Sequence, residues 1–212
     1  MPDDETPGRT YRKAAARRAQ ILSRAIELFA ERGVGASLRA IGEAIGVSHA
    51  ALRYYFASRD ELLVEVYREH EVREHQELPG DASAVAVMIR SAESNRAIPG
   101  LVELYATLTT EALQSDRHPA AHRFVVDRFR AVRAELAERI RTAQRDQKVA
   151  SDIDPVDAAA LAVAASDGLQ LQWLLEPDAV DVSRVLRLLE RLLPGAAADH
   201  DFAAAPDDEA DG

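Results

Sequence analysis

Side chains suited to contacts with a nucleic acid are concentrated in one short stretch, from Ser37 to Leu62 (SLRAIGEAIGVSHAALRYYFASRDEL). The guanidinium group of Arg53 can donate two parallel hydrogen bonds to the O6 and N7 atoms of guanine, which is the commonest base-specific contact. Ala51 can pack against the methyl group of thymine. Arg59 carries a fixed positive charge that suits a phosphate. These residue types fit the recognition of double-stranded DNA.

Two short helices separated by a tight turn are expected to position these residues. Ser37 and Ser48 stand where each helix would begin, and serine is a favoured N-cap. Gly46 stands between the helices, where a residue with positive φ would go. The apolar positions at helical spacing are Leu38, Ile41 and Ile45 in the first helix and Leu52, Tyr55 and Phe56 in the second. This pattern is typical of a helix-turn-helix, although an ordinary helical hairpin shows the same periodicity.

The flanking sequence resembles the tetracycline-repressor (TetR) family of bacterial regulators. The resemblance covers roughly residues 12–75 and is carried by Ile21-Leu22, Phe29-Ala30-Glu31-Arg32-Gly33, Ser37-Leu38-Arg39-Ala40-Ile41-Gly42, Gly46-Val47-Ser48 and the segment from Leu52 to Leu63. It implies an all-α fold with an N-terminal three-helix helix-turn-helix DNA-binding domain. A C-terminal helical domain would then bind an effector and form a homodimer.

The resemblance also implies which residues contact DNA. The matching positions are Arg39, Ser48, His49, Ala51, Arg53 and Tyr54, with Tyr55 and Arg59 at positions that contact the DNA backbone. Of the two adjacent tyrosines, Tyr55 is expected to pack its ring under the helix. Arg53, Tyr55 and Arg59 replace the more usual Tyr, His and Lys of the family, so the operator sequence does not follow from the resemblance.

The charge of the chain is divided unevenly along its length. The net charge of the 212 residues is −10, but residues 9–59 hold ten Lys or Arg and three Asp or Glu, a net of +7. A small basic module on an acidic body is typical of a nucleic-acid-binding protein. The chain has no cysteine, which excludes disulfides and thiol chemistry. It shows no membrane span or secretion signal, so we expect a cytoplasmic protein with no membrane partner.

The chain divides into three expected parts. Residues 1–58 form the DNA-binding domain, with residues 1–10 as a disordered arm, and residues 59–193 form the second domain. Residues 194–212 hold six acidic residues and no Lys or Arg, which indicates a disordered acidic tail. The expected helices of the second domain span residues 82–93, 101–115, 119–148, 155–176 and 182–193, with Asp154 as the N-cap of the fourth.

No catalytic motif is apparent in the sequence. A phosphate-binding loop, a Gly-rich dinucleotide turn and a Glu-x-x-His pair are all missing. The segment from His70 to His75 (HEVREH) places its two histidines about 140° apart on a helix at 100° per residue, so they would not converge on a metal. We therefore expect no enzyme activity, no metal and no cofactor.

An effector site is expected where polar or aromatic residues interrupt the apolar stripes of the second domain. The candidates are Tyr105, His122, Phe129, Asp167 and Trp173. Such a cavity would suit a small apolar molecule. His122 could equally be a hydrogen-bonded core histidine, and Asp167 could be paired within a dimer interface.

The last two expected helices have the composition of a dimer interface. The first of them is rich in small residues, and the second is apolar over a wide arc. The expected interface residues are Ala164, Gly168, Leu171, Leu186, Leu189 and Leu193. Burial of the last helix within its own chain is the alternative.

These expectations together describe a TetR-type regulator that binds a palindromic operator. It would be a repressor released by a small apolar effector, although the sequence itself does not fix the sign of regulation. The alternative is a helical small-molecule-binding protein or enzyme with a vestigial helix-turn-helix. The basic charge of residues 9–59 favours the regulator.

Overall fold

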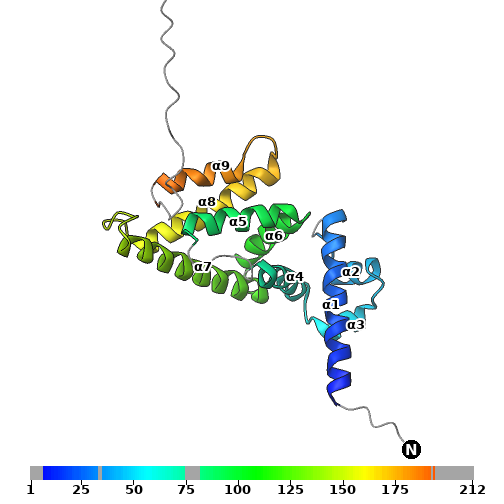
Figure 1. Cartoon of the computed structure of the whole chain (residues 1–212). Coiled ribbons are helices and arrows are strands. Elements are labelled where there is room, and N and C mark those ends of the chain that lie inside the picture. Colours follow the sequence, from blue (N-terminus) through cyan, green and yellow to red (C-terminus); the bar gives the residue numbers. More distant parts are fainter. Residues whose placement is uncertain (1–6, 33–34, 75–81, 192, 194–212) are drawn as a thin grey trace, which may run out of the picture.

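The structure, a computed structural model, describes residues 7–32, 35–74, 82–191 and 193, and the regular elements in these residues are all helices. Figure 1 shows α1–α3 gathered at one end, α4 leading away from them, and α5–α9 packed together beyond it. The helices are α1 (Pro7–Arg32), α2 (Leu38–Ala44), α3 (His49–Tyr55), α4 (Arg59–Glu74), α5 (Ala84–Ala97), α6 (Leu101–Ala112), α7 (Pro119–Arg145), α8 (Pro155–Leu175) and α9 (Val182–Leu186), followed by a 3-10 helix, η1 (Arg187–Arg191). The described residues contain no strand, so the expected all-α fold is confirmed. None of the described helices is long and apolar enough to cross a membrane.

Local sequence rules account for the pair α2 and α3. The Oγ atom of Ser37 accepts a hydrogen bond from the amide of Ala40 at 3.2 Å, and that of Ser48 accepts one from the amide of Ala51 at 3.1 Å. Each bond satisfies an amide that the first turn of a helix leaves without a partner. Gly46 has a φ of +68°. Both expected N-caps and the expected left-handed glycine are therefore confirmed.

A second glycine, Gly42, allows α2 to approach the turn closely. The amide of Val47 donates to the carbonyl oxygen of Gly42 at 2.8 Å. A Cβ atom at position 42 would lie 2.7 Å from the carbonyl oxygen of Val47, which is closer than such atoms approach. Arg24 of α1 donates to the carbonyl oxygen of Ile45 at 2.9 Å, so the same turn is tied to α1.

The first hydrophobic core joins α1–α3 to the helices that follow. It begins with Ile21, Leu22 and Phe29 of α1 and continues through α2, α3 and α4. Beyond α4 it takes in Leu101, Leu104, Tyr105, Leu108 and Ala112 of α6 and Ala121, Phe124 and Val125 of α7. The core therefore runs past residue 58, where we expected the domain boundary. The helices α1–α3 are called the N-terminal unit below.

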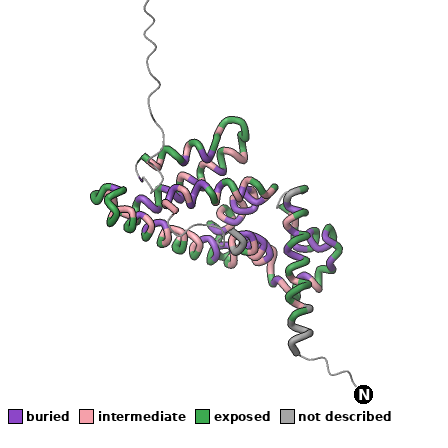
Figure 2. Tube along the Cα trace, viewed as in Figure 1, coloured by how far each residue is buried: buried purple, intermediate pink, exposed green. Residues whose placement is uncertain are grey.

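The second hydrophobic core lies between α5, the later part of α7, α8 and α9. Val85, Leu136, Ala159 and Leu186 are each completely buried in it. Phe129 of α7 packs against both cores. In contrast, residues 176–181, which join α8 to α9, are exposed along most of their length (Figure 2).

Three expected boundaries are wrong. The helix α1 begins at Pro7, so residues 7–10 do not belong to a disordered arm; proline suits the first position of a helix because its φ is already helical. The helix α5 begins after Ser83, whose Oγ caps the amide of Ala86 at 3.0 Å, and runs on to Ala97. The last helix ends at Leu186 and continues as η1. The expected tail, residues 194–212, lies outside the described residues.

Candidate functional site

The outer side of α3 is an exposed polar surface. Ser48, His49 and Arg53 are exposed, and the side chain of Tyr54 is 80% exposed. The opposite side of the helix is anchored by Leu52, which is completely buried. A short helix that is held on one side and capped at its start presents its other side in a fixed orientation, as a DNA-reading helix must.

Two of the predicted DNA-contacting residues on α3 are less accessible. Ala51 and Tyr55 are half-buried and pack against the first core. The rings of Tyr54 and Tyr55 meet edge to face, with 5.0 Å between their centroids. The expectation that the ring of Tyr55 packs under the helix is therefore confirmed. Arg39 is exposed on α2, where its Nε atom lies 3.0 Å from the carboxylate of Glu43.

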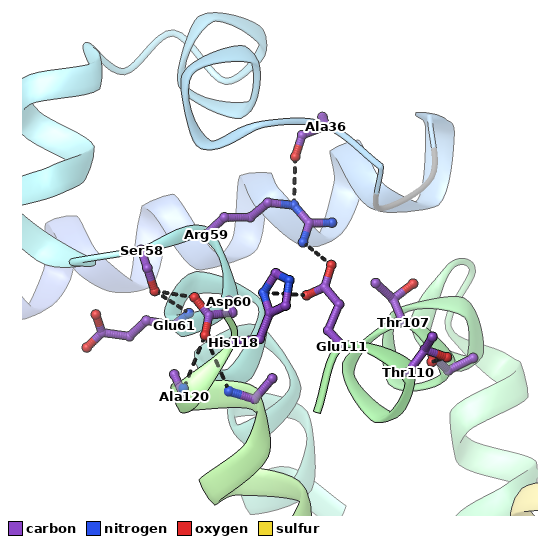
Figure 3. A network of polar contacts seen from close by, with 12 residues as sticks. Ala36, Ser58, Arg59, Asp60, Glu61, Thr107, Thr110, Glu111, His118 and Ala120 are labelled. Atoms are coloured by element: carbon purple, nitrogen blue, oxygen red, sulfur yellow. Dashed lines mark hydrogen bonds and ion pairs between the residues drawn. The ribbon is translucent and has the colours of Figure 1, made fainter. Parts of the chain in front are cut away.

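Arg59 does not join this surface. Its Nε atom donates to the carbonyl oxygen of Ala36 at 2.9 Å, and its Nη1 atom donates to the carboxylate of Glu111 at 2.5 Å (Figure 3). Its side chain is 21% exposed. The prediction placed Arg59 on the DNA backbone because of its position at the start of α4, but that turn packs against α6, which supplies a carboxylate from 52 positions later.

A second cluster of polar groups lies in the interior of the helices α4–α8. Arg128 is at its centre: its Nε atom donates to the carboxylate of Glu71 at 2.6 Å and its Nη1 atom to the hydroxyl of Tyr105 at 3.0 Å. The guanidinium carbon lies 4.6 Å from the centroid of the Tyr105 ring, which itself stacks on Tyr67 with 5.0 Å between centroids. The hydroxyl of Tyr105 reaches Asp167 of α8 at 3.4 Å. We call these five residues the Arg128 cluster.

Burial controls the charges in the Arg128 cluster. It raises the pKa of Asp167, although the positive charge of Arg128 and the hydrogen bond from Tyr105 act in the opposite direction. It also raises the pKa of the Tyr105 hydroxyl, which therefore stays protonated. Burial alone would lower the pKa of Arg128, but Tyr67, Tyr105 and Glu71 outweigh it and the net pKa is raised. The carboxyl group of Asp167 is half-buried and accepts the hydrogen bond of the Tyr105 hydroxyl, next to the pair of Arg128 and Glu71.

The structure brings together only part of the predicted effector site. Tyr105 and Asp167 are in contact, and Phe129 follows Arg128 on α7. Trp173 lies apart from them, half-buried beside Arg96, whose guanidinium carbon is 5.6 Å from the centroid of its ring.

The placement of His122 in this site is wrong. Its side chain is exposed, and its Nδ1 atom lies 2.9 Å from the carbonyl oxygen of Ala112. The start of α7 is held by Asp60, whose Oδ2 atom accepts from the amides of Ala120 at 3.1 Å and Ala121 at 3.5 Å. This contact turns Ala121 inward, so His122 points outward.

Sequence reasoning missed Arg128, Glu71 and Tyr67. A charged residue between Val125 and Phe129, on the inner side of a helix, is the signal that could have identified Arg128.

The sequence also gave no sign of a buried row of hydrogen bonds between three helices. The Nε2 atom of His70 lies 3.1 Å from Oδ1 of Asn95, and Nδ2 of Asn95 donates to Oε1 of Gln170 at 2.9 Å. These bonds connect α4, α5 and α8.

The predicted dimer residues separate into two groups. Ala164, Gly168 and Leu171 are exposed on α8, and a Cβ atom at Gly168 would meet no atom within 4 Å. With Leu161 and Leu175, they recur at spacings of three and four and form one side of the helix, called the α8 face below. Leu186 and Leu193 are buried in the second core, so their assignment to a dimer surface is wrong, and Leu189 is half-buried. The tight packing of α9 onto α5 and α8 explains its wide apolar arc.

Comparison with known proteins identifies similar sequences for both halves of the chain. The family described as bacterial regulatory proteins, tetR family, matches residues 21–66, and that described as BetI-type transcriptional repressor, C-terminal, matches residues 103–198. The two segments together make up more than half of the chain. The HTH-type transcriptional regulator PksA of Bacillus subtilis (strain 168) is 28% identical over 183 residues, which cover 82% of this chain and 86% of the relative.

Solved structures share the fold. A transcriptional regulator from Saccharomonospora viridis, in complex with choline, is 26% identical, covers 84% of this chain and 96% of its own, and superimposes with a TM-score of 0.67. The SmeT–triclosan complex is 22% identical, covers 93% of this chain and 98% of its own, and has a TM-score of 0.65. At that identity the second similarity shows the fold alone.

Proposed function

Because the chain belongs to the tetR family of bacterial transcriptional regulators, we propose that it represses transcription by binding a palindromic operator as a homodimer. A small molecule that binds within the second domain would release the operator. The observation that carries this proposal is the exposed surface of α3, on a helix capped by Ser48 and anchored by Leu52. In a dimer, two such helices must lie about 34 Å apart, one turn of DNA, or a multiple of it.

The Arg128 cluster is the proposed effector site. The rings of Tyr67 and Tyr105 offer apolar surface, and the half-buried carboxyl group of Asp167 offers a hydrogen-bond acceptor. This combination favours an effector with an apolar body and one positively charged or hydrogen-bond-donating group. Choline, which is bound by the similar regulator from Saccharomonospora viridis, is such a molecule and is the first compound to test.

Release of the operator requires that the effector binds the conformation that cannot bind DNA more tightly than the conformation that can. A ligand with equal affinity for the two conformations would leave their populations unchanged, however tightly it binds. The Arg128 cluster suits this task because it joins α4, which leads to the N-terminal unit, to α6, α7 and α8. An effector that separates Asp167 from Tyr105 would therefore alter contacts of all four helices.

The test has two steps. The preferred DNA sequence is first selected from a random pool with the purified protein, and its affinity is measured by fluorescence anisotropy. Choline and a panel of amines and apolar metabolites are then added to the complex. We expect Asp167→Asn and Tyr105→Phe to bind the operator as the wild type does but to need at least tenfold more effector for release.

His122→Ala is the matched control, because His122 is exposed outside the cluster; its response should match that of the wild type. If Asp167→Asn and Tyr105→Phe also respond as the wild type does, the effector site lies elsewhere. If the wild type binds random DNA as tightly as the selected sequence, the chain is no sequence-specific regulator. A helix-turn-helix without function, the alternative drawn from the sequence, would give this second result.

A further inference from the structure

Two consecutive residues at the start of α4 bind two different helices of the second domain. Arg59 donates to Glu111 of α6 and to the carbonyl oxygen of Ala36, just before α2. Asp60 accepts from the amides of Ala120 and Ala121 in the first turn of α7. Figure 3 shows these contacts side by side. The segment 111–121, called the α6–α7 corner below, is thus attached to the first turn of α4 by two charged side chains.

The ion pair between Arg59 and Glu111 is partly buried. Their side chains are 21% and 18% exposed, and the Oε2 atom of Glu111 is buried with no hydrogen-bond partner among the described residues. The Nδ1 atom of His118 lies 3.7 Å from this oxygen. A partly buried carboxylate is costly without a charged partner, because burial removes part of its hydration. Glu111 therefore holds the guanidinium group of Arg59 in place, and Arg59 stabilises Glu111 in return.

Two arginine side chains join the N-terminal unit to α4 and to the corner. Arg18 of α1 pairs with Glu65 of α4. Arg59 is bonded at once to Ala36, which belongs to the loop before α2, and to the α6–α7 corner. The guanidinium group of Arg59 thus links the N-terminal unit directly to α6, 52 positions away in sequence from Arg59 itself.

We propose that Arg59 and Glu111 are a positioning pair that fixes the N-terminal unit against the α6–α7 corner, and that Arg59 does not serve as a phosphate contact. The positioning role depends on the proposed function, because it requires that the protein binds an operator. A palindromic operator demands a fixed separation between the two α3 helices of a dimer. An N-terminal unit that is already held at a fixed angle loses little conformational entropy when the dimer binds both half-sites. A loosened unit must first be ordered, which weakens binding.

The two possible roles of Arg59 predict different outcomes. If Arg59 contacted a phosphate, Arg59→Ala would lower the slope of log affinity against log salt by about one unit. Glu111→Gln would then leave affinity unchanged or raise it, since it removes an acidic group. If the two residues are a positioning pair, either change weakens operator binding, and the salt slope stays at the wild-type value.

The experiment is a double-mutant cycle on operator binding with Arg59→Ala, Glu111→Gln and the double variant, each titrated at several salt concentrations. We expect each single variant to bind about three- to thirtyfold more weakly and the double variant to bind no more weakly than the worse single one. Arg145→Ala, which removes an exposed pair with Glu138 at the far end of α7, is the control and should bind as the wild type does.

A second measurement separates positioning from general loss of structure. The selected operator is remade with its half-sites one base pair closer and one base pair farther apart. Glu111→Gln should narrow the difference in affinity between the matched and the shifted operators, whereas a variant that is merely less folded would lose affinity for all three in proportion.

A lower salt slope for Arg59→Ala together with unchanged binding by Glu111→Gln would overturn the positioning pair and restore the phosphate contact. Equal losses on all three operators would overturn it as well. Both results leave the proposed function intact, because that function fails only if the wild type shows no sequence preference.

Discussion

Arg53 and Arg128 place the same guanidinium group in two different surroundings. Arg53 is exposed on the outer side of α3, the surface that we propose binds DNA. Arg128 lies over the ring of Tyr105 and is bonded to Glu71 at 2.6 Å. The planar arrangement of donors suits guanine in the first setting and a carboxylate with aromatic rings in the second. Surroundings, and not residue type, therefore decide which arginine can bind DNA and which stabilises the interior.

Arg53→Ala should cost about 1–3 kcal/mol of operator binding and relax base preference at one position of each half-site. The reason is the loss of a bidentate contact that distinguishes guanine from the other bases. The measurement is a repeat of the DNA selection with the variant, followed by affinity titration. Arg53→Lys is the matched control, since it keeps the charge and loses the paired donors: it should retain general affinity and still lose the preference. An unaltered base preference in both variants would show that Arg53 contacts no base.

Residues whose roles depend on near neighbours could be predicted from the sequence. Ser37, Ser48 and Gly46 satisfy or shape groups within three or four positions, and all three expectations hold. The roles of Arg59 and Arg128 could not be predicted, because their carboxylate partners lie 52 and 57 positions away. Which carboxylate meets which arginine depends on how α4, α6 and α7 pack, and helical periodicity alone does not determine that packing.

At the scale of elements, α4 contacts the second domain through both its first turn and its later turns. Its first turn binds the α6–α7 corner, and its later turns contribute Tyr67 and Glu71 to the Arg128 cluster. The carboxylate of Asp60 also caps the first turn of α7, a helix that begins with Pro119 and lacks a side-chain cap from its own N-cap residue, His118. A cap supplied by another helix fixes the start of α7 relative to α4.

Asp60→Asn should lower the free energy of unfolding by about 0.5–2 kcal/mol at pH 7, the usual value of an N-cap. Burial would raise the pKa of Asp60, but hydrogen bonds from Ser58, Ala121 and Ala120 outweigh it and hold that pKa below its usual range. The stabilisation is therefore fully present above the pKa of an unfolded aspartate, about 3.9, and is lost as the pH falls through the lower pKa of the folded state.

Urea unfolding of the wild type and of Asp60→Asn at several pH values tests this expectation. The difference between the two should be constant from about pH 5 to 7 and should shrink below about pH 4. Asp152→Asn, in the exposed loop between α7 and α8, is the control and should leave the stability unchanged. A difference that persists undiminished at low pH would mean that the charge of Asp60 contributes nothing.

At the scale of the whole molecule, the α8 face brings together large apolar side chains that the described residues leave exposed. Leu161, Leu171 and Leu175 are 52%, 47% and 74% exposed, and the small residues between them permit close approach of a second helix. By contrast, the wide apolar arc of the last helix is buried in the second core of the same chain. The sequence predicted both helices as the interface, because composition shows that a surface must be buried but not against which partner.

Leu171→Glu should yield monomers and lose operator binding, since a single half-site binds weakly. Sedimentation velocity at micromolar concentration and anisotropy with the operator measure the two effects. Leu188→Glu is the matched control: Leu188 is 61% exposed in η1, outside the α8 face, and the change should alter neither property. A stable dimer of Leu171→Glu would place the interface elsewhere.

The first hydrophobic core has a consequence for exchanging parts between regulators. Its buried members extend from Ile21 in α1 to Val125 in α7 and come from every helix between them except α5, so a cut after residue 58 would pass through a packed interior. A chimaera that joins only α1–α3 to the second domain of another regulator would pack Leu22 and Phe29 against side chains that do not fit them. The transferable unit therefore includes α4 and the facing surfaces of α6 and α7, and new specificity is better introduced by changing the outer side of α3 than by transplanting a domain.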